Sequence, residues 1–342
     1  MAIYLIMSRY NRNVIKLLIG LSVGIIFLFI WFKIVDIGLV TDSLRNLKIQ
    51  YVLIGITCYN IAYFIRALRW RMLLNTVVSI GVIRAYLTVM GGHFTNYLIP
   101  LRAGEFIKCF FIKKMTGVRM SQSMPSVFLD KLYDTIGIVL VLVLLPFLNI
   151  NIHPYLNYLL IVIVLFVLVA LLLLVFVMSN KEGVHVFIKR FFSLFPAKWQ
   201  DRLDEILRYF IDGIALFKEH KRITLPAIVL SLMVILFDSL FFFSMFLAFG
   251  KQISYFYVLF GYTLIYLSFI VPHPPAQIGS NELLMVLVFA VGFGMNRDVV
   301  SAVMVFAHLI TGIVIVGLGM ISYSYAGVSL MNIIDRGDEF HE

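Results

Sequence analysis

Two polar stretches interrupt otherwise apolar regions of this chain. Asn96–Glu105 has the sequence NYLIPLRAGE and interrupts residues 84–115, and Pro272–Glu282 has the sequence PHPPAQIGSNE and interrupts residues 254–293. Proline and glycine at this density stop a helix. The piece after each break is too short to cross a bilayer, and irregular backbone is tolerated at membrane depth only where protein or a water-filled cavity satisfies it. We therefore expect two helical hairpins that enter the membrane and turn back.

The composition of the whole chain supports a membrane setting. The 342 residues are 62% hydrophobic and 13% charged, with a mean hydropathy of +1.00. The charged share is about half that of soluble domains, which excludes a soluble enzyme, a disordered protein and a disulfide scaffold. The net charge of +10 points to anionic lipid surfaces and positive-inside loops rather than to nucleic acid. Cys58 and Cys109 show no zinc-binding spacing.

Six further stretches are long and apolar enough to cross a bilayer. They are Val14–Lys33, Tyr51–Leu74, Ser123–Asn149, Leu156–Met178, Thr224–Phe249 and Val299–Ala326. No small-residue cleavage site follows the first stretch, so we expect an uncleaved anchor rather than a signal peptide. With the two broken regions, these spans predict an all-α polytopic membrane protein of about eight helical membrane units.

The basic residues predict an orientation for these spans. With the N-terminus in the cytoplasm, 21 of the 28 Lys and Arg residues fall on the cytoplasmic side and 5 on the outer side. This distribution agrees with the positive-inside rule. We expect a multi-pass protein of a prokaryotic plasma membrane with both termini in the cytoplasm.

The order of the units predicts two inverted repeats, residues 1–150 and 151–342. Each repeat consists of two spans, a broken re-entrant hairpin and a third span, with the hairpins at about 84–115 and about 254–293. Inverted repeats with interrupted helices in matching positions point to a transport site near the membrane midplane. In the second repeat, residues 180–222 are predicted to form a cytoplasmic amphipathic segment, which either lies on the membrane interface or packs as a connector.

The ionisable groups inside the spans and breaks are the candidate site residues, because charge within a membrane is costly. Asp130 and Asp134 are four residues apart and share one helix face. Arg102 offers a planar fork suited to phosphate. Nearby carboxylates such as Glu105 and Glu282 could bind an amine, a cation or a proton. Structural ion pairs within a helix bundle are the competing interpretation of these residues.

The other charged groups are less specific signals. Arg66, Arg69 and Arg71 are typical interface anchors, although Arg66 is deep enough to face a site. Asp238 and His308 are single titratable groups in apolar helices, and a structural role is the favoured interpretation of both.

Signatures of known enzyme chemistry are missing from the sequence. It contains no P-loop, no Cys-x-x-Cys pair, no Gly-x-Ser-x-Gly and no His-Glu-x-x-His. Lys108 follows Glu105 by three residues and is expected to pair with it on a helix. No catalytic residue, metal ligand or cofactor is therefore predicted.

Four short runs carry a resemblance to a known family. They are Arg66-x-x-Arg69-Trp70-Arg71, Asn96-x-x-x-Pro100-x-Arg102-x-Gly104-Glu105, Asp130-Lys131-x-x-Asp134 and Pro272-x-Pro274-Pro275-x-x-x-Gly279-Ser280-x-Glu282. In this order they resemble the lysylphosphatidylglycerol synthase transmembrane-region family, whose members are also described as flippase-like integral membrane proteins. In that family the membrane region stands alone or is fused to an aminoacyl transferase domain. The present chain resembles the stand-alone form.

The resemblance implies a central cavity and a set of residues that line it. The implied residues are Arg66, Arg102, Glu105, Asp130, Asp134 and Glu282, and Asn96, in the same run as Arg102, is a further candidate binding residue. Many relatives have an arginine in the last span where this chain has His308. This departure implies weaker or pH-dependent binding of a headgroup phosphate by His308.

Two functions from different classes follow. The first is a lipid translocase that moves an anionic phospholipid or a polyprenyl-phosphate-linked lipid between leaflets. The alternative is a lipid-binding accessory protein, without transport, for a membrane glycosyltransferase or lipid-modifying enzyme. A membrane-embedded transferase with Asp130 or Glu282 as a base is the least favoured, because no nucleophile–base pair is visible. Small-residue runs such as Gly312–Gly319 would also permit a homo-oligomer.

Overall fold

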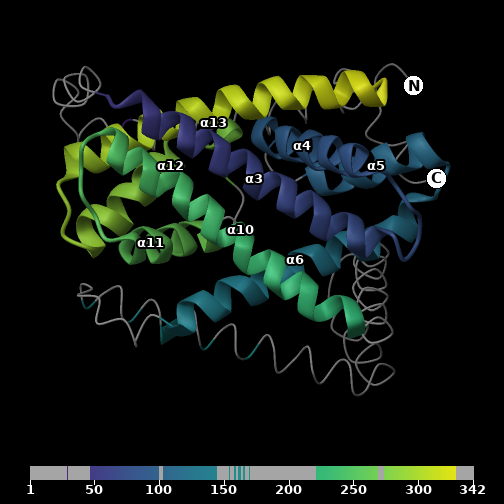
Figure 1. Cartoon of the computed structure of the whole chain (residues 1–342), viewed down its shortest axis with the longest axis horizontal. Helices are drawn as coiled ribbons and strands as arrows, with labels where there is room; N and C mark the ends of the chain where they lie inside the picture. The colour runs from purple at the N-terminus through teal and green to yellow at the C-terminus, as the bar shows by residue number, and fades with distance from the viewer. Residues whose placement is uncertain are drawn as a thin grey trace, which may run out of the picture.

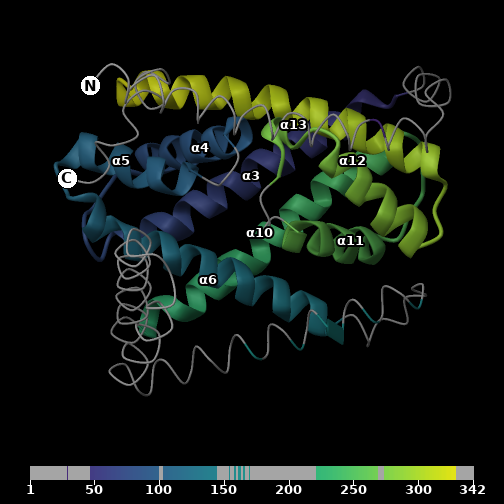
Figure 2. The same ribbon diagram turned by 180° about the vertical axis from the view of Figure 1, so that it is seen from behind.

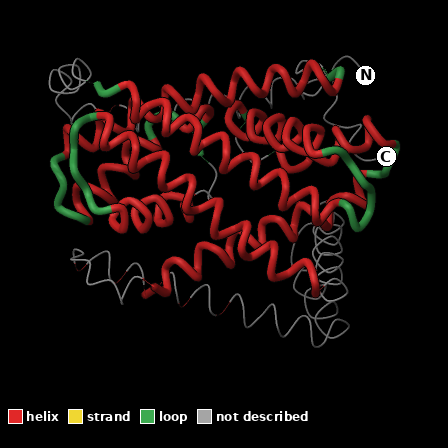
Figure 3. Tube along the Cα trace, in the orientation of Figure 1, coloured by secondary structure: helices red, strands yellow, loops and turns green. Residues whose placement is uncertain are grey.

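The computed structural model describes residues 47–99, 103–144, 221–268 and 273–328, with a few single positions elsewhere. The expected spans Val14–Lys33 and Leu156–Met178 and the amphipathic segment within residues 180–222 lie outside this part. Arg102 also lies outside it. The described residues are helices joined by loops, with no strand among them (Figure 3). An all-α membrane protein is the fold class that these helices support.

The first half contributes four described helices. They are α3 (Ile49–Leu74), α4 (Val82–Leu98), α5 (Gly104–Thr116) and α6 (Met120–Leu144). The predicted first break separates α4 from α5. The α5 helix ends at Gly117, which has a φ of 78°, a left-handed conformation that glycine adopts at little cost.

The second half contributes three longer helices and three short elements. They are α10 (Lys221–Ala248), α11 (Tyr255–Ser268), the 3-10 turn η2 (Pro275–Gln277), α12 (Ser280–Met285), the π-helix η3 (Val286–Gly292) and α13 (Arg297–Ala326). The predicted second break separates α11 from α12. The π-helical stretch after α12 was not predicted.

Three described helices are long and apolar enough to cross a membrane, namely α3, α10 and α13. The α6 helix covers another expected span, but Asp130, Lys131 and Asp134 lie within it. Whether the two broken regions are re-entrant stays a prediction, because it depends on where the membrane lies.

The antiparallel pair α3 and α10 forms the centre of the described structure. The Lys48 N–H donates to the Ala248 carbonyl at 2.9 Å, so the start of α3 lies beside the end of α10. A Cβ on Gly55 of α3 would lie 2.3 Å from Met245 of α10. Lipid tails are as apolar as the side chains, so close approach through small residues is what holds membrane helices together.

The remaining helices surround this pair. The α13 helix runs along one edge and packs on α4, and α6 lies toward the opposite edge (Figure 1 and Figure 2). The α4 and α5 helices meet backbone to backbone, since a Cβ on Gly104 would lie 1.8 Å from the Gly92 carbonyl oxygen. This contact holds the helices on either side of the first break together.

Candidate functional site

A cavity of about 320 Å³, lined by both apolar and polar side chains, lies between the two halves. Its walls come from α3, α4, α5, α6, α10, α11, α13 and the segment of the second break. The charged, amide and imidazole side chains that line it are Arg66, His93, Asn96, Glu105, Lys108, Asp130, Lys131, Asp134, Asp238, His273, Gln277, Asn281 and His308. Several of these project from the middle of long apolar helices, where charge is expensive and is usually paired.

The first ion-pair cluster is centred on Arg69, which is fully buried. Its Nη2 lies 2.8 Å from Asp130 Oδ1 and 2.7 Å from Asp134 Oδ1. Its Nε donates to Asp130 Oδ1 at 2.9 Å, and its Nη1 donates to Ser231 Oγ of α10 at 2.6 Å. Both aspartates contact the same guanidinium because they lie on one face of α6.

Two lysines extend this cluster to α5. The Lys108 ammonium lies 2.7 Å from Glu105 Oε2, which confirms the expected pairing along a helix. The Lys131 ammonium lies 2.9 Å from Glu105 Oε1 and 3.8 Å from Asp134 Oδ2. Three cations therefore face three carboxylates, and Arg69, Lys108 and Lys131 are balanced by Glu105, Asp130 and Asp134. Burial of this charge is tolerated because each group has an opposite partner.

A second ion pair joins the central helices. Arg66 of α3 contacts Asp238 of α10 through both nitrogens, at 2.5 Å from Nη2 to Oδ2 and 3.3 Å from Nη1 to Oδ1. The Tyr262 hydroxyl donates to Asp238 Oδ2 at 2.6 Å. The Tyr266 hydroxyl donates to Asp134 Oδ2 at 3.2 Å, so the two clusters are linked through α11.

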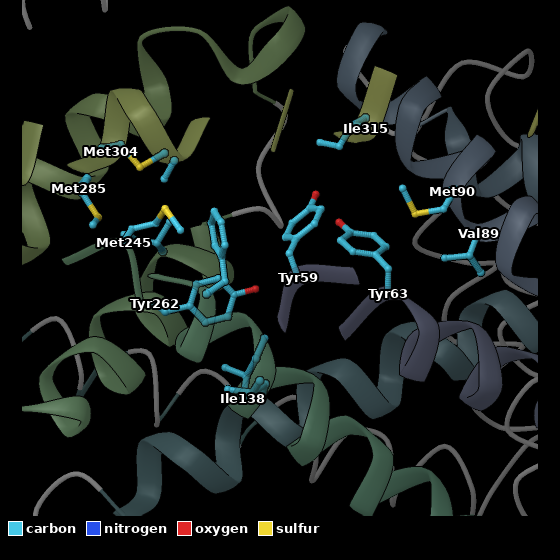
Figure 4. Close-up of a cluster of buried hydrophobic side chains, with 14 of the residues drawn as sticks. Tyr59, Tyr63, Val89, Met90, Ile138, Met245, Tyr262, Met285, Met304 and Ile315 are labelled. Carbon is cyan, nitrogen blue, oxygen red and sulfur yellow. The ribbon is translucent and has the colours of Figure 1, made fainter. Parts of the chain in front are cut away.

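Aromatic rings form much of the wall around the Arg66 guanidinium. Its Cζ lies 4.7 Å from the ring centroid of Tyr63 and 5.6 Å from that of Tyr266, which are favourable cation–π distances. The Tyr63 and Tyr59 hydroxyls lie 2.5 Å and 3.3 Å from His93 Nε2. Figure 4 shows these two hydroxyls close to each other.

The second break contributes a different kind of polar group. His308 of α13 contacts Glu282 of α12 at 2.6 Å and the Ala276 carbonyl at 2.7 Å. Ala276 and Gln277 have φ angles of 54° and 57°, in the left-handed region that costs a residue with a Cβ about 1–2 kcal/mol. The bend is held by hydrogen bonds, including Gln277 N–H to the Pro274 carbonyl at 2.8 Å and Asn281 Nδ2 to Gln277 Oε1 at 2.8 Å.

The structure brings most of the candidate residues to this one cavity. The residues that line it are Arg66, Asn96, Glu105, Asp130, Asp134 and His308. Glu282 is buried against His308. Asn96 Oδ1 accepts from the Gly104 N–H at 2.8 Å and so caps the start of α5. The role expected for Arg102 falls on a residue outside the described part of the chain.

Sequence reasoning missed several partners in this site. The expectation that Arg69 is an interface anchor is wrong, because Asp130 and Asp134 hold it in the protein interior. Lys108 is buried as well, and its ammonium also lies 3.6 Å from Asp130 Oδ2, a second partner that was not predicted. The lone acidic residue of α10, Asp238, was visible in the sequence, but its partner Arg66 is 172 residues away.

The described part of the chain contains no group of three or more His, Cys, Asp or Glu residues arranged to hold a metal ion. The described side chains that line the cavity offer paired cations, carboxylates, hydroxyls and imidazoles. Such groups can exchange partners with an ionic headgroup or take up and release protons.

Comparisons with known proteins place this architecture in a family. The chain is 22% identical over 321 residues to a UPF0104 membrane protein of Methanothermobacter thermautotrophicus, a match that covers 90% of this chain and 95% of that protein. It is 25% identical over 309 residues to a UPF0104 membrane protein of Methanocaldococcus jannaschii, covering 86% of this chain and 91% of that protein. The family model of the lysylphosphatidylglycerol synthase TM region matches residues 13–319. The chain therefore belongs to the family of the lysylphosphatidylglycerol synthase TM region.

Proposed function

We propose that this protein is a lipid translocase, which moves an anionic phospholipid or a polyprenyl-phosphate-linked lipid between the leaflets of a prokaryotic plasma membrane. The observation that carries the proposal is the cavity of about 320 Å³, lined by paired charges, among helices apolar enough to cross a membrane. Ionic groups within membrane-spanning helices usually have a functional role, because their burial is costly. A headgroup would occupy the cavity while the acyl chains stay in the bilayer.

Among the described cations that line the cavity, Lys131 is the one that a headgroup phosphate would reach first. Its side chain is 41% exposed, against 11% for Arg66 and 6% for Lys108. A phosphate that pairs with Lys131 takes the place of Glu105, whose carboxylate keeps Lys108 as its partner. When the phosphate replaces the Glu105 carboxylate, Lys131 keeps an anionic partner, so the cost of an unpaired buried charge is avoided.

Helix pairing supports the proposal of two inverted repeats, residues 1–150 and 151–342. The antiparallel α3 and α10 helices pack on each other, and each packs on the helix that follows it, α4 or α11. The last described helix of each half packs on the other half, α6 on α11 and α13 on α4. In our proposal the two halves rock around the shared cavity, the behaviour of transporters built from inverted repeats.

The proposal is tested with the purified protein in liposomes that contain a fluorescent phosphatidylglycerol. Translocation is followed by quenching of the outer-leaflet dye. We expect wild-type protein to accelerate exchange over empty liposomes, and Lys131→Gln to slow it at least about tenfold, equivalent to ~1.4 kcal/mol in the barrier. Lys251→Gln, in the exposed loop after α10, is the matched control. The same assay with Arg102→Ala tests the phosphate role predicted for that residue.

A second variant separates function from folding. Lys131→Gln with Glu105→Gln removes one charge of each sign and keeps the cluster balanced, so it should fold like the wild type and still translocate slowly. Wild-type exchange by this double variant would overturn the role of Lys131. Exchange no faster than in empty liposomes for every form, together with copurification of a lipid and a membrane enzyme, would instead favour the lipid-binding accessory protein.

A further inference from the structure

Both ring nitrogens of His308 face hydrogen-bond acceptors. Nδ1 lies 2.6 Å from Glu282 Oε1, and Nε2 lies 2.7 Å from the Ala276 carbonyl oxygen. A carbonyl can only accept, so Nε2 carries a hydrogen and donates it. A neutral imidazole has then no hydrogen left at Nδ1, and two lone pairs would face each other at 2.6 Å if Glu282 were ionised. The geometry therefore requires one additional proton between Nδ1 and Oε1.

The surroundings of Glu282 also require this additional proton. Its second oxygen, Oε2, is buried and has no hydrogen-bond partner in the described structure. An ionised carboxylate in that position without a counter-charge would be strongly disfavoured. With one shared proton the His308–Glu282 pair is neutral overall, whichever of the two residues holds it.

No other described cation beside His308 provides this compensation. Among the elements packed against α13, α4 presents the Tyr97 hydroxyl at 3.4 Å from His308 Nε2. The charged cavity groups of α5, Glu105 and Lys108, pair with each other, and Asp238 of α10 pairs with Arg66. His93 of α4 bonds to tyrosines, and η3 carries no titratable side chain. His273 lines the same cavity and is therefore included as a control below.

We propose that His308 and Glu282 together form a proton-binding site, and that the bound proton holds the strained bend at Ala276–Gln277 against α13. Release transfers the proton to water in the cavity, which His308 lines. The pair is then left with one negative charge, and the lone-pair repulsion between Nδ1 and Oε1 pushes α12 and the bend away from α13. The proton site itself does not depend on the proposed function. Only the assignment of the proton as the coupling ion of the translocase rests on that function.

The first experiment measures the bend and not transport. Ile278 is partly exposed at the end of the bend, and a spin label on Ile278→Cys, in a Cys58→Ser background in lipid nanodiscs, reports its mobility between pH 5 and pH 9. We expect the label to be immobile at low pH and mobile at high pH. Glu282→Gln should keep the label immobile at every pH, because the Gln amide N–H donates to His308 Nδ1 and no additional proton is needed. His308→Gln should leave it mobile at every pH.

Two outcomes of this experiment would overturn the proton site. One is a wild-type label whose mobility is independent of pH. The other is a Glu282→Gln variant that titrates as the wild type does. His273→Gln is the matched control and should retain the transition. Loss of the transition in His273→Gln and its retention in His308→Gln would assign the proton to His273 instead.

The second experiment measures coupling in liposomes with fluorescent phosphatidylglycerol and an imposed pH gradient. Wild-type protein should accumulate the dye lipid in one leaflet, and Glu282→Gln should lose at least about nine-tenths of this accumulation when it is compared with the variant's own exchange rate measured without a gradient. A label that titrates in a protein that moves no lipid means that the proton site stands and the translocase fails. If both wild type and Glu282→Gln exchange lipid, and the gradient drives equal accumulation in both, the translocase stands and the proton site fails.

Discussion

The two breaks are held in place by different physical means. At the first break, α4 and α5 touch through Gly92 and Gly104, and a cluster of three cations and three carboxylates lies beside α5. At the second break, two residues with left-handed backbone are held by hydrogen bonds and by His308. Arg and Lys keep their charges at physiological pH, whereas His does not. The comparison teaches that the first break is built to stay fixed and the second can respond to a proton.

The largest expected effect is at the first break. Arg69→Met leaves Asp130 and Asp134 without their main partner, and loss of one member of a buried ion cluster costs about 3–5 kcal/mol. Thermal unfolding in detergent checks this, with a thiol-reactive dye that reaches the buried Cys109 only after unfolding, in a Cys58→Ser background.

A rescue variant and a surface variant sharpen this first prediction. Adding Asp130→Asn to Arg69→Met restores the charge balance and should recover most of the stability. The matched control is Arg84→Met, an exposed arginine that bonds to Tyr325, with an expected change within about 0.5 kcal/mol. A loss below about 1 kcal/mol for Arg69→Met would contradict the view that charge pairing fixes the first break.

An intermediate effect is expected where the two helix backbones touch. Gly104→Ala places a methyl group 1.8 Å from the Gly92 carbonyl oxygen, so α4 and α5 must separate, at a cost of about 3 kcal/mol. Gly317→Ala in α13 meets nothing within 4 Å and should stabilise by about 0.5–1 kcal/mol through helix propensity. Equal stability of the two variants in the dye assay would disprove the backbone contact.

The smallest effect is expected at the second break. Ala276→Gly removes the Cβ from a residue with a φ of 54°, so strain relief offsets the entropy of glycine and the protein should gain about 1 kcal/mol or less. Ala67→Gly, at a buried helical position of α3, should lose about 0.5–1 kcal/mol. Denaturant unfolding in detergent measures both. A loss for Ala276→Gly as large as that for Ala67→Gly would show that the bend is unstrained.

Local sequence features predicted the membrane class, the three long apolar helices and the position of both helix breaks. Apolar length, Pro and Gly act locally, so they can be read from neighbouring residues. The pair Glu105–Lys108 was predicted for the same reason, because both residues lie on one turn of a helix.

Which charges meet depends on how the helices pack in three dimensions. Arg69 finds Asp130 and Ser231, which are 61 and 162 residues away, and Asp238 finds Arg66 and Tyr262. The left-handed bend at Ala276 likewise depends on His308, 32 residues away. Partners at such separations are set by how the helices pack, and packing in a membrane depends on the shape of small contact residues rather than on hydrophobicity.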